Sequence, residues 1–299
     1  LERARSGADL AALHRVIEPI GLDALSPVLD ALVRHFAAGG WSGRADAAAL
    51  DAPGIRRALA GDGAVAVPDA VMAKLAEGGR RQRLEQLAAG LERAPDQLGV
   101  DGRFGSLLDG LVAEVTGSSG NTGRVPAQLI VDRLAPLIDP VTASTVRIGG
   151  SLAGDVWRHP LAWAEDRSRE LVPFHSLLLA LVLDLVEPLE EASTPLADLD
   201  QLPVPADRVL AAQMLRLGLV RSRHPAVARL RHPPGSDIVV ELRALSVALC
   251  ERLADRLRAE LGRTAHDLPV VRIVEPLAQL AMKWREAPGP GIAINSTSF

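Results

Sequence analysis

The sequence has few aromatic side chains. It contains no tyrosine, and phenylalanine and tryptophan together make up only 3% of its 299 residues. Strand-rich domains depend on aromatic and β-branched residues, whereas the alanine and leucine that dominate this chain favour helices. We therefore expect a mainly α-helical protein with, at most, a few short strands.

Cysteine, clustered charge and long uncharged runs are also scarce. Cys250 is the single cysteine, which excludes an intramolecular disulfide and fits a reducing cytoplasm. The net charge is −4 with both signs interspersed, so nucleic acid is not expected as a partner. The longest apolar run, 177–183, ends at Asp184, short of the roughly 18 uncharged apolar residues that a membrane span needs. The first residues lack the apolar core of a signal peptide. We expect a cytoplasmic protein without a membrane span.

The sequence motifs of common cofactor and metal enzymes are absent. The sequence has no pair of CxxC motifs and no HExxH, which would indicate a zinc site. It also has no GxSxG of serine hydrolases and no dinucleotide-binding glycine fingerprint after a strand. TGSSGNTG (116–123) lacks the Lys-Ser/Thr that completes a phosphate-binding loop, and it has the composition of a flexible linker. We therefore expect no metal and no cofactor.

Helical periodicity recurs through most of the chain without a repeat of fixed length. The clearest helix is 236–262, which Ser236 or Asp237 caps and Gly262 ends. Its apolar stripe is Ile238, Leu242, Leu245, Leu249, Leu253, Leu257 and Leu261. The residues 171–192 predict a second long, largely buried helix. We expect one large helical domain over 1–299 with irregular Gly/Pro-rich connections, a flexible connector near 116–124 and a Pro-rich connector near 195–207.

Some polar residues stand in unusually apolar or glycine-rich surroundings. His175 precedes the apolar run, either as a core-edge histidine bonded to a backbone carbonyl or as a catalytic group at the mouth of a pocket. Glu241 and Arg243 lie within VVELRALSVAL, either as solvated flank residues or as a carboxylate near an arginine in an apolar wall. The second arrangement suits acid–base chemistry or anion binding.

The segment GDVWRHP (154–160) is a further candidate. Gly154 and Pro160 indicate a fixed loop, and loops that carry several polar and aromatic side chains are often functional, although a structural role is equally open. The side chains it presents are Asp155, Trp157, Arg158 and His159. Glu275, in IVEPLAQL, is most simply a helix residue near a kink at Pro276.

Taken in order, these stretches resemble the uracil catabolism protein 4 family, and the resemblance covers most of the chain. The matching pieces are RHFAAGG (34–40), GRFGSLLDGL (102–111), GRVPAQLIVDRL (123–134), GGSLAGDVWRHP (149–160), the segments 171–192 and 236–253, the region of Glu275, and the tail TSF (297–299). The resemblance implies a step that cleaves a ribosylurea phosphate into urea and a sugar phosphate. That step would need a carboxylate beside an oxocarbenium-like centre and cationic groups for the phosphate. His175, Glu241, Arg243, Glu275 and Asp155 fall at matching family positions.

The sequence departs from the family pattern where polar groups are expected. After PFH the family has lysine, Gln-Trp and tyrosine, whereas this chain has Ser176 and then aliphatic residues. Leu242 replaces a tryptophan, Pro276 begins the segment that replaces Gly-Gly-Thr-Trp, and Asn295 replaces an aspartate. A sugar phosphate requires polar partners, whereas an aliphatic wall suits a bulky, weakly polar ligand.

We therefore expect a repurposed small-molecule enzyme with an apolar pocket, which catalyses a cyclisation, rearrangement or elimination on a specialised metabolite. The expected catalytic residues are His175, Glu241, Arg243 and Asp155. The expected substrate-binding residues are Trp157, Phe174, Arg34, His35, Glu275 and Asn295. Two alternatives stay open: cleavage of a ribosylurea phosphate, and a non-catalytic relic that binds a ligand. A homodimer is also left open.

Overall fold

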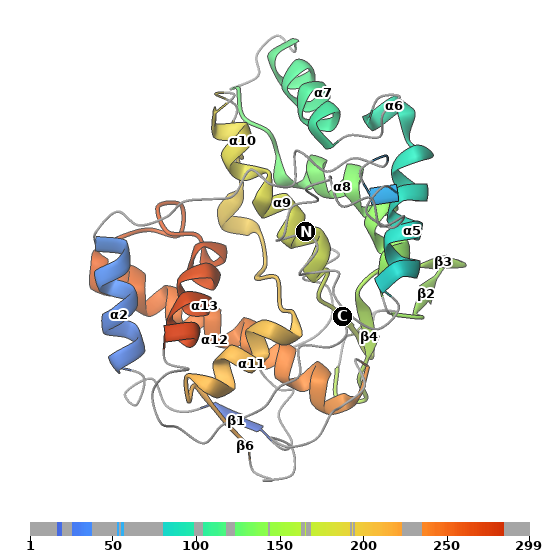
Figure 1. The fold of residues 1–299 in the computed structure, drawn as a ribbon. Coiled ribbons are helices and arrows are strands. Elements are labelled where there is room, and N and C mark those ends of the chain that lie inside the picture. Colours follow the sequence, from blue (N-terminus) through green and yellow to red (C-terminus); the bar gives the residue numbers. More distant parts are fainter. Residues whose placement is uncertain are drawn as a thin grey trace. The chain divides into compact units, whose positions relative to one another are not determined.

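The structure is a computed structural model of the 299-residue chain (Figure 1). It describes residues 17–19, 26–37, 53, 55–56, 80–98, 104–117, 123–142, 144–162, 165, 169–191, 193, 195–222 and 235–283. The chain divides into two compact units. The first comprises Leu1–Trp41, Val156–Ser176 and Asp200–Ser296, and the second comprises Ser42–Asp155, Leu177–Leu199 and Thr297–Phe299.

The first unit is built around one long helix, α12 (Asp237–Leu261). It packs against α2 (Ser26–Ala37) and α11 (Arg208–Arg216), both of which also contact α13 (Val274–Lys283). The remaining elements are the 3-10 helix η6 (Val270–Ile273) and two antiparallel pairs, β1 (Ile17–Pro19) with β6 (Val220–Ser222) and β4 (Val156–Arg158) with β5 (Leu171–Pro173). Gly262 ends α12 in a left-handed conformation (φ 61°), which a residue without Cβ adopts at little cost.

The second unit is a set of shorter helices around an aliphatic core. Its elements are α5 (Arg80–Glu92), α6 (Pro95–Leu98), α7 (Phe104–Gly117), α8 (Ala127–Ile138), η4 (Asp139–Val141), the hairpin β2 (Arg147–Ile148) with β3 (Ser151–Leu152), α9 (Ser176–Asp184) after its first residue, and α10 (Val186–Glu191). The 3-10 helix η5 (Leu199–Gln201) crosses the boundary, because Leu199 belongs to the second unit and its other two residues to the first. Helices α5 and α8 pack closely at Gly90, where a Cβ would lie only 3.4 Å from the Leu137 carbonyl oxygen. Leu87, Leu91, Ile130 and Leu134 are almost fully buried.

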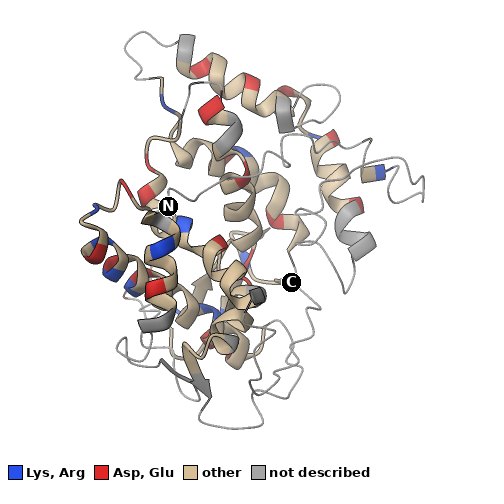
Figure 2. Cartoon of the chain, turned by 60° about the vertical axis from the view of Figure 1, so that its left-hand side comes forward, with Lys and Arg blue, Asp and Glu red and all other residues tan. Residues whose placement is uncertain are grey.

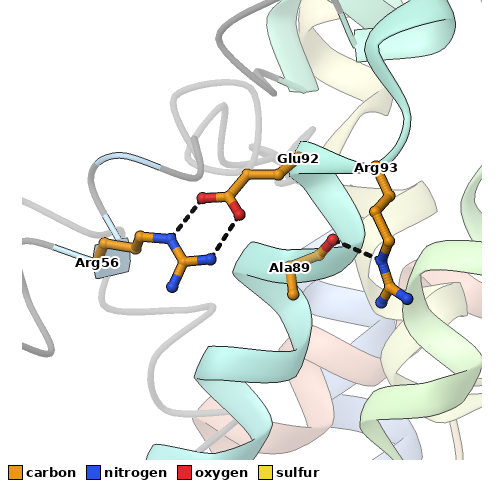
Figure 3. A network of polar contacts seen from close by, with 4 residues as sticks. All are labelled: Arg56, Ala89, Glu92 and Arg93. Carbon is orange, nitrogen blue, oxygen red and sulfur yellow. Dashed lines mark hydrogen bonds and ion pairs between the residues drawn. The ribbon is translucent and has the colours of Figure 1, made fainter.

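Surface charges of the second unit include an ion pair that joins separate segments. Both Nε and Nη2 of Arg56 donate to the carboxylate of Glu92, and Arg93 donates from Nε to the Ala89 carbonyl (Figure 3). The Arg56 guanidinium lowers the pKa of Glu92 through this hydrogen bond. Acidic and basic residues are interspersed along the described elements (Figure 2).

The mainly helical prediction is confirmed, and the described residues form three small two-stranded sheets. The single long helix predicted over 171–192 is wrong in detail. That span contains β5, then α9 and α10, which are separated at Leu185. Pro188 has no N–H to donate to the carbonyl of Asp184, so the helical ladder is interrupted there. In the described residues, no helix is both long and apolar enough to cross a membrane.

The two predicted connectors differ in what the structure describes of them. Most of 116–124 lies outside the described residues, whereas 195–207 is described in full. The Pro-rich connector is extended except for η5, and the boundary between the two units falls between its residues 199 and 200. Leu196, Leu202 and Val204 are buried, so this connector contributes to the core. The single-domain expectation stays a prediction.

Candidate functional site

The candidate site is organised by a short antiparallel ribbon in the first unit. Strands β4 and β5 pair Val156 with Pro173, Trp157 with Val172, and Arg158 with Leu171. The pairing continues past the strands, because the His159 N–H donates to the Glu170 carbonyl at 2.8 Å. The His159 carbonyl accepts from the Ala162 N–H at 3.0 Å, and the Ala162 carbonyl accepts from the Glu170 N–H at 2.8 Å. These backbone bonds fix the loop that contains His159.

Two strained residues bracket strand β5. Glu170 has φ 68° and His175 has φ 48°, so both adopt the left-handed backbone conformation. For a residue with a Cβ this conformation costs roughly 1–2 kcal/mol, and it persists only where neighbouring contacts hold it. His175 is half-buried, and Phe174 and Ser176 on either side of it are buried.

Arg243 of α12 contacts both neighbours of His175. Its Nη2 donates to the Ser176 hydroxyl at 2.8 Å, and its guanidinium carbon lies 4.0 Å from the centroid of the Phe174 ring. Its Nε donates to the Ala206 carbonyl at 2.6 Å. Only 4% of Arg243 is exposed, so this cation–π contact and these hydrogen bonds form away from solvent. One guanidinium thus holds the chain before and after His175.

Glu241, two residues earlier on α12, contacts His159. The Nε2 atom of His159 lies 3.2 Å from the Oε1 atom of Glu241, and 0% and 1% of the two side chains are exposed. The Leu161 N–H donates to His159 Nδ1 at 3.1 Å. Because Nδ1 accepts a hydrogen bond, we assign the hydrogen to Nε2, which donates it to the Glu241 carboxylate.

Trp157 contacts the chain just before α12. A Cβ built on Gly235 would lie 2.5 Å from a carbon of the Trp157 ring, so any larger residue at 235 would displace this ring. Gly235 precedes Ser236, the residue at the N-terminal cap of α12. The ribbon residue Trp157 therefore packs directly on the start of this helix.

Asp155 belongs to the second unit, where it acts on another carboxyl group. Burial, and next the charge of Asp155, raise the pKa of Asp139 to about 6. Asp139 packs tightly against Gly154, whose φ of 74° and lack of a Cβ both suit this turn. The carboxyl group of Asp139, from η4, thus lies close to the turn that contains Gly154 and Asp155.

The other predicted substrate-binding residues occupy different elements. Arg34 is exposed and His35 is half-buried, and both lie in the last turn of α2. Glu275 lies in the first turn of α13 and accepts a hydrogen bond from Gln279 Nε2 at 3.3 Å. Asn295 lies outside the described residues.

The structure thus brings some predicted site residues together and gives others separate surroundings. Phe174 and Arg243 meet around His175, whereas Glu241 and Arg243, expected as neighbours in one wall, each have their own partners. The sequence pointed to His159 only as one side chain of the candidate loop GDVWRHP, and it gave no role to Ser176 or Asp139.

Two further predictions concern metal ligands and an apolar pocket. Within the described ranges, no three His, Cys, Asp or Glu side chains gather closely enough to hold a metal ion. The aliphatic residues that follow His175 include Leu178, Leu179, Leu181 and Val182, all almost completely buried as core. The apolar pocket therefore stays a prediction.

A family model described as "Protein of unknown function (DUF1688)" matches residues 31–296, a span that contains all of the candidate site residues. No curated protein matches the chain. Because the match covers most of the sequence, the chain belongs to the DUF1688 family of proteins of unknown function.

Proposed function

We propose that this protein is a small-molecule enzyme in which His175 donates and accepts protons at the reacting centre. The observation that carries the proposal is the left-handed backbone at His175, which lies between two buried residues that contact the same arginine. Strained residues cluster at active sites, where the surrounding contacts hold them in place. Histidine is also the side chain used most often for proton transfer near neutral pH.

Arg243 gives this centre an electrostatic role as well as a structural one. Its buried guanidinium lies beside the chain that carries His175, so it favours negative charge that develops on a bound substrate. A cation held by Phe174, Ser176 and Ala206 needs no rearrangement during the reaction, which is the condition for effective stabilisation of a transition state.

The reaction class that we favour is an elimination, rearrangement or cyclisation of a weakly polar metabolite. Such reactions can proceed by removal of a proton at one atom and return of a proton at another, which one histidine beside a fixed cation can support. The aliphatic residues that stand where the resembled family carries polar ones favour a substrate with little charge.

Cleavage of a ribosylurea phosphate is the second candidate, because the chain resembles the uracil catabolism protein 4 family. Arg243 and the Ser176 hydroxyl, 2.8 Å apart, are groups that bind phosphate oxygens well. This candidate predicts that urea and a sugar phosphate are released in equal amounts.

The test is to incubate the purified chain with a metabolite extract and, separately, with synthetic ribosylurea 5′-phosphate. Mass spectrometry would follow the compounds that are consumed and formed. We expect a conversion by the parent protein that His175→Ala reduces at least 100-fold. His266→Ala is the matched control, because His266 is an exposed histidine in the loop after α12, and we expect it to retain full turnover.

The outcomes separate the candidates. Conversion of an extract compound without release of urea supports the favoured reaction class, and consumption of ribosylurea 5′-phosphate supports the second. Equal turnover by His175→Ala and the parent protein would contradict the role of His175. A small molecule retained in native mass spectrometry without any turnover would support a ligand-binding relic. The homodimer stays a prediction that light scattering can test.

A further inference from the structure

The β4–β5 ribbon meets α12 at three places. Trp157 packs against Gly235 at the start of the helix, His159 binds Glu241, and the chain around His175 binds Arg243. The two charged contacts come from opposite ends of the ribbon. His159 lies beyond the Arg158–Leu171 pair, and Phe174 lies beyond the Val156–Pro173 pair.

The dimensions of ribbon and helix agree with this arrangement. Glu170, opposite His159, is four residues from Phe174, which corresponds to about 13 Å of extended chain. Residues two apart on an α-helix are about 200° apart around its axis, and a helix with its side chains is roughly 10–12 Å across. Glu241 and Arg243 therefore project from opposite sides of α12 and reach opposite ends of the ribbon.

Two anchors on opposite sides of a helix fix its rotation about its own axis. If the Glu241 anchor is released, α12 can turn, and the Arg243 guanidinium then moves relative to Phe174 and Ser176. Displacements of about 1 Å in a catalytic group can lower a rate by roughly 100-fold. A contact remote from His175 can therefore control the geometry at His175.

Both nitrogens of His159 take part in this anchor. Nδ1 accepts from the Leu161 N–H and so fixes the ring within its own loop, while Nε2 faces Glu241. The first bond maintains the loop, and the second connects the loop to α12. These two roles can be separated by mutation.

We infer that His159 and Glu241 form a positioning pair, which sets the rotation of α12 so that Arg243 holds His175 in its left-handed conformation. The two residues are fully buried, so they act through α12 and not by touching a substrate. The effect on turnover rests on the proposed function of His175, whereas the effect on the conformation of His175 does not.

The test compares His159→Asn with His159→Gln. Asparagine places an acceptor near the position of Nδ1 and can keep the bond from Leu161, but it does not reach Glu241. Glutamine places a donor near the position of Nε2 and can keep the bond to Glu241, but it loses the bond from Leu161. A positioning pair requires the Glu241 bond, whereas a purely structural histidine is more sensitive to loss of the loop bond.

The first readout needs no substrate. In protein labelled with ¹⁵N-histidine, the His175 signal is identified by its loss in His175→Ala. We expect His159→Asn and Glu241→Ala to shift the His175 signal, and His159→Gln and Glu241→Gln to leave it near its parent position. Melting temperatures of the four variants show whether each variant is folded and how far it is destabilised.

The second readout is turnover of the compound found in the extract assay. We expect kcat to fall at least tenfold in His159→Asn, with KM changed less than threefold, and to stay within threefold of the parent value in His159→Gln. Equal effects of the two substitutions, or losses that follow melting temperature alone, would overturn the inference. If His175→Ala retains turnover, the proposed function fails, but the His175 signal still decides whether the pair positions this residue.

Discussion

The two halves of helix α12 use charged residues in opposite ways. In the C-terminal half, the charged side chains lie on the exposed face while Leu253 and Leu257 are buried. In the N-terminal half, Glu241 and Arg243 are almost completely buried, whereas Leu242 between them is only half-buried. The same helix is therefore an ordinary amphipathic helix at one end and a carrier of buried charge at the other.

The difference indicates where the molecule accepts a cost in stability. The pair Arg256–Glu260 is exposed and has a separation of 3.1 Å, and such pairs typically contribute about 0–1 kcal/mol. Burial of a charge costs several kcal/mol before its partners compensate, and replacement of the charged group together with its partners by apolar residues is often at least as stable. The buried charges of the N-terminal half, Glu241 and Arg243, are thus better explained by the geometry that they impose on His175 than by a contribution to stability.

The largest expected effect comes from removal of the buried cation. Arg243→Met should lower the free energy of unfolding by about 4 kcal/mol, because the Ser176 hydroxyl and Ala206 carbonyl lose this donor in a buried setting. Arg256→Met, the same change at an exposed position in the C-terminal half, should alter the free energy of unfolding by less than about 0.5 kcal/mol. Urea unfolding measures both, and similar losses would remove the distinction between the halves.

A core substitution in the C-terminal half of α12 separates stability from function. Leu257 is fully buried, and Leu257→Ala should lower the free energy of unfolding by about 3 kcal/mol because it leaves a cavity. We expect the turnover that depends on His175 to stay within twofold of the parent value below the melting temperature. If Leu257→Ala lowered turnover as much as Arg243→Met does, the whole of α12, and not only its N-terminal half, would govern the site.

The contact at the start of α12 should give a smaller effect. Gly235→Ala should lower the free energy of unfolding by about 1–2 kcal/mol because its methyl group meets the Trp157 ring. Fluorescence should report the displaced ring, with Trp157→Phe identifying its emission. In contrast, Gly110→Ala in α7, where a Cβ meets nothing within 4 Å, should raise stability slightly. An unchanged spectrum in Gly235→Ala would rule out the contact.

Asp139, in the second unit, gives an effect that depends on pH. Its pKa in the folded protein, about 6, exceeds the ordinary value of 3.8 because of burial and Asp155. The neutral form is therefore favoured on folding, and this contribution is complete below pH 4 and lost as the pH rises through 6. Asp139→Asn should raise the melting temperature at pH 7.5, with the gain vanishing near pH 4. A lower melting temperature at pH 7.5 would contradict the sign.

The sequence predicted the parts of this fold that depend on local pattern. Periodicity and end signals defined α12 to within about a residue, because Ser236 and Gly262 flank it. Strands β4 and β5 have three residues each, too few to show an alternating pattern. The helix break at Leu185 follows from Pro188, a local signal that was present in the sequence.

The site depends on contacts between distant parts of the chain. His159 and Glu241 are 82 residues apart, and Arg243 contacts residues 37 and 67 positions away. Their apolar surroundings singled out Glu241 and Arg243, but only the folded structure supplies their partners. The left-handed backbone at His175 could not be predicted either, because histidine adopts that conformation more often than most residues but still in only a small minority of cases.

The central claim, that the protein keeps a strained backbone at His175, is tested most directly by comparison of two variants. His175→Gly and His175→Ala both remove the imidazole, but only glycine adopts φ 48° without strain. We predict that urea unfolding finds His175→Gly more stable than His175→Ala by about 1 kcal/mol. If His175→Gly is instead the less stable of the two, as expected for glycine at an unstrained position, the account is contradicted.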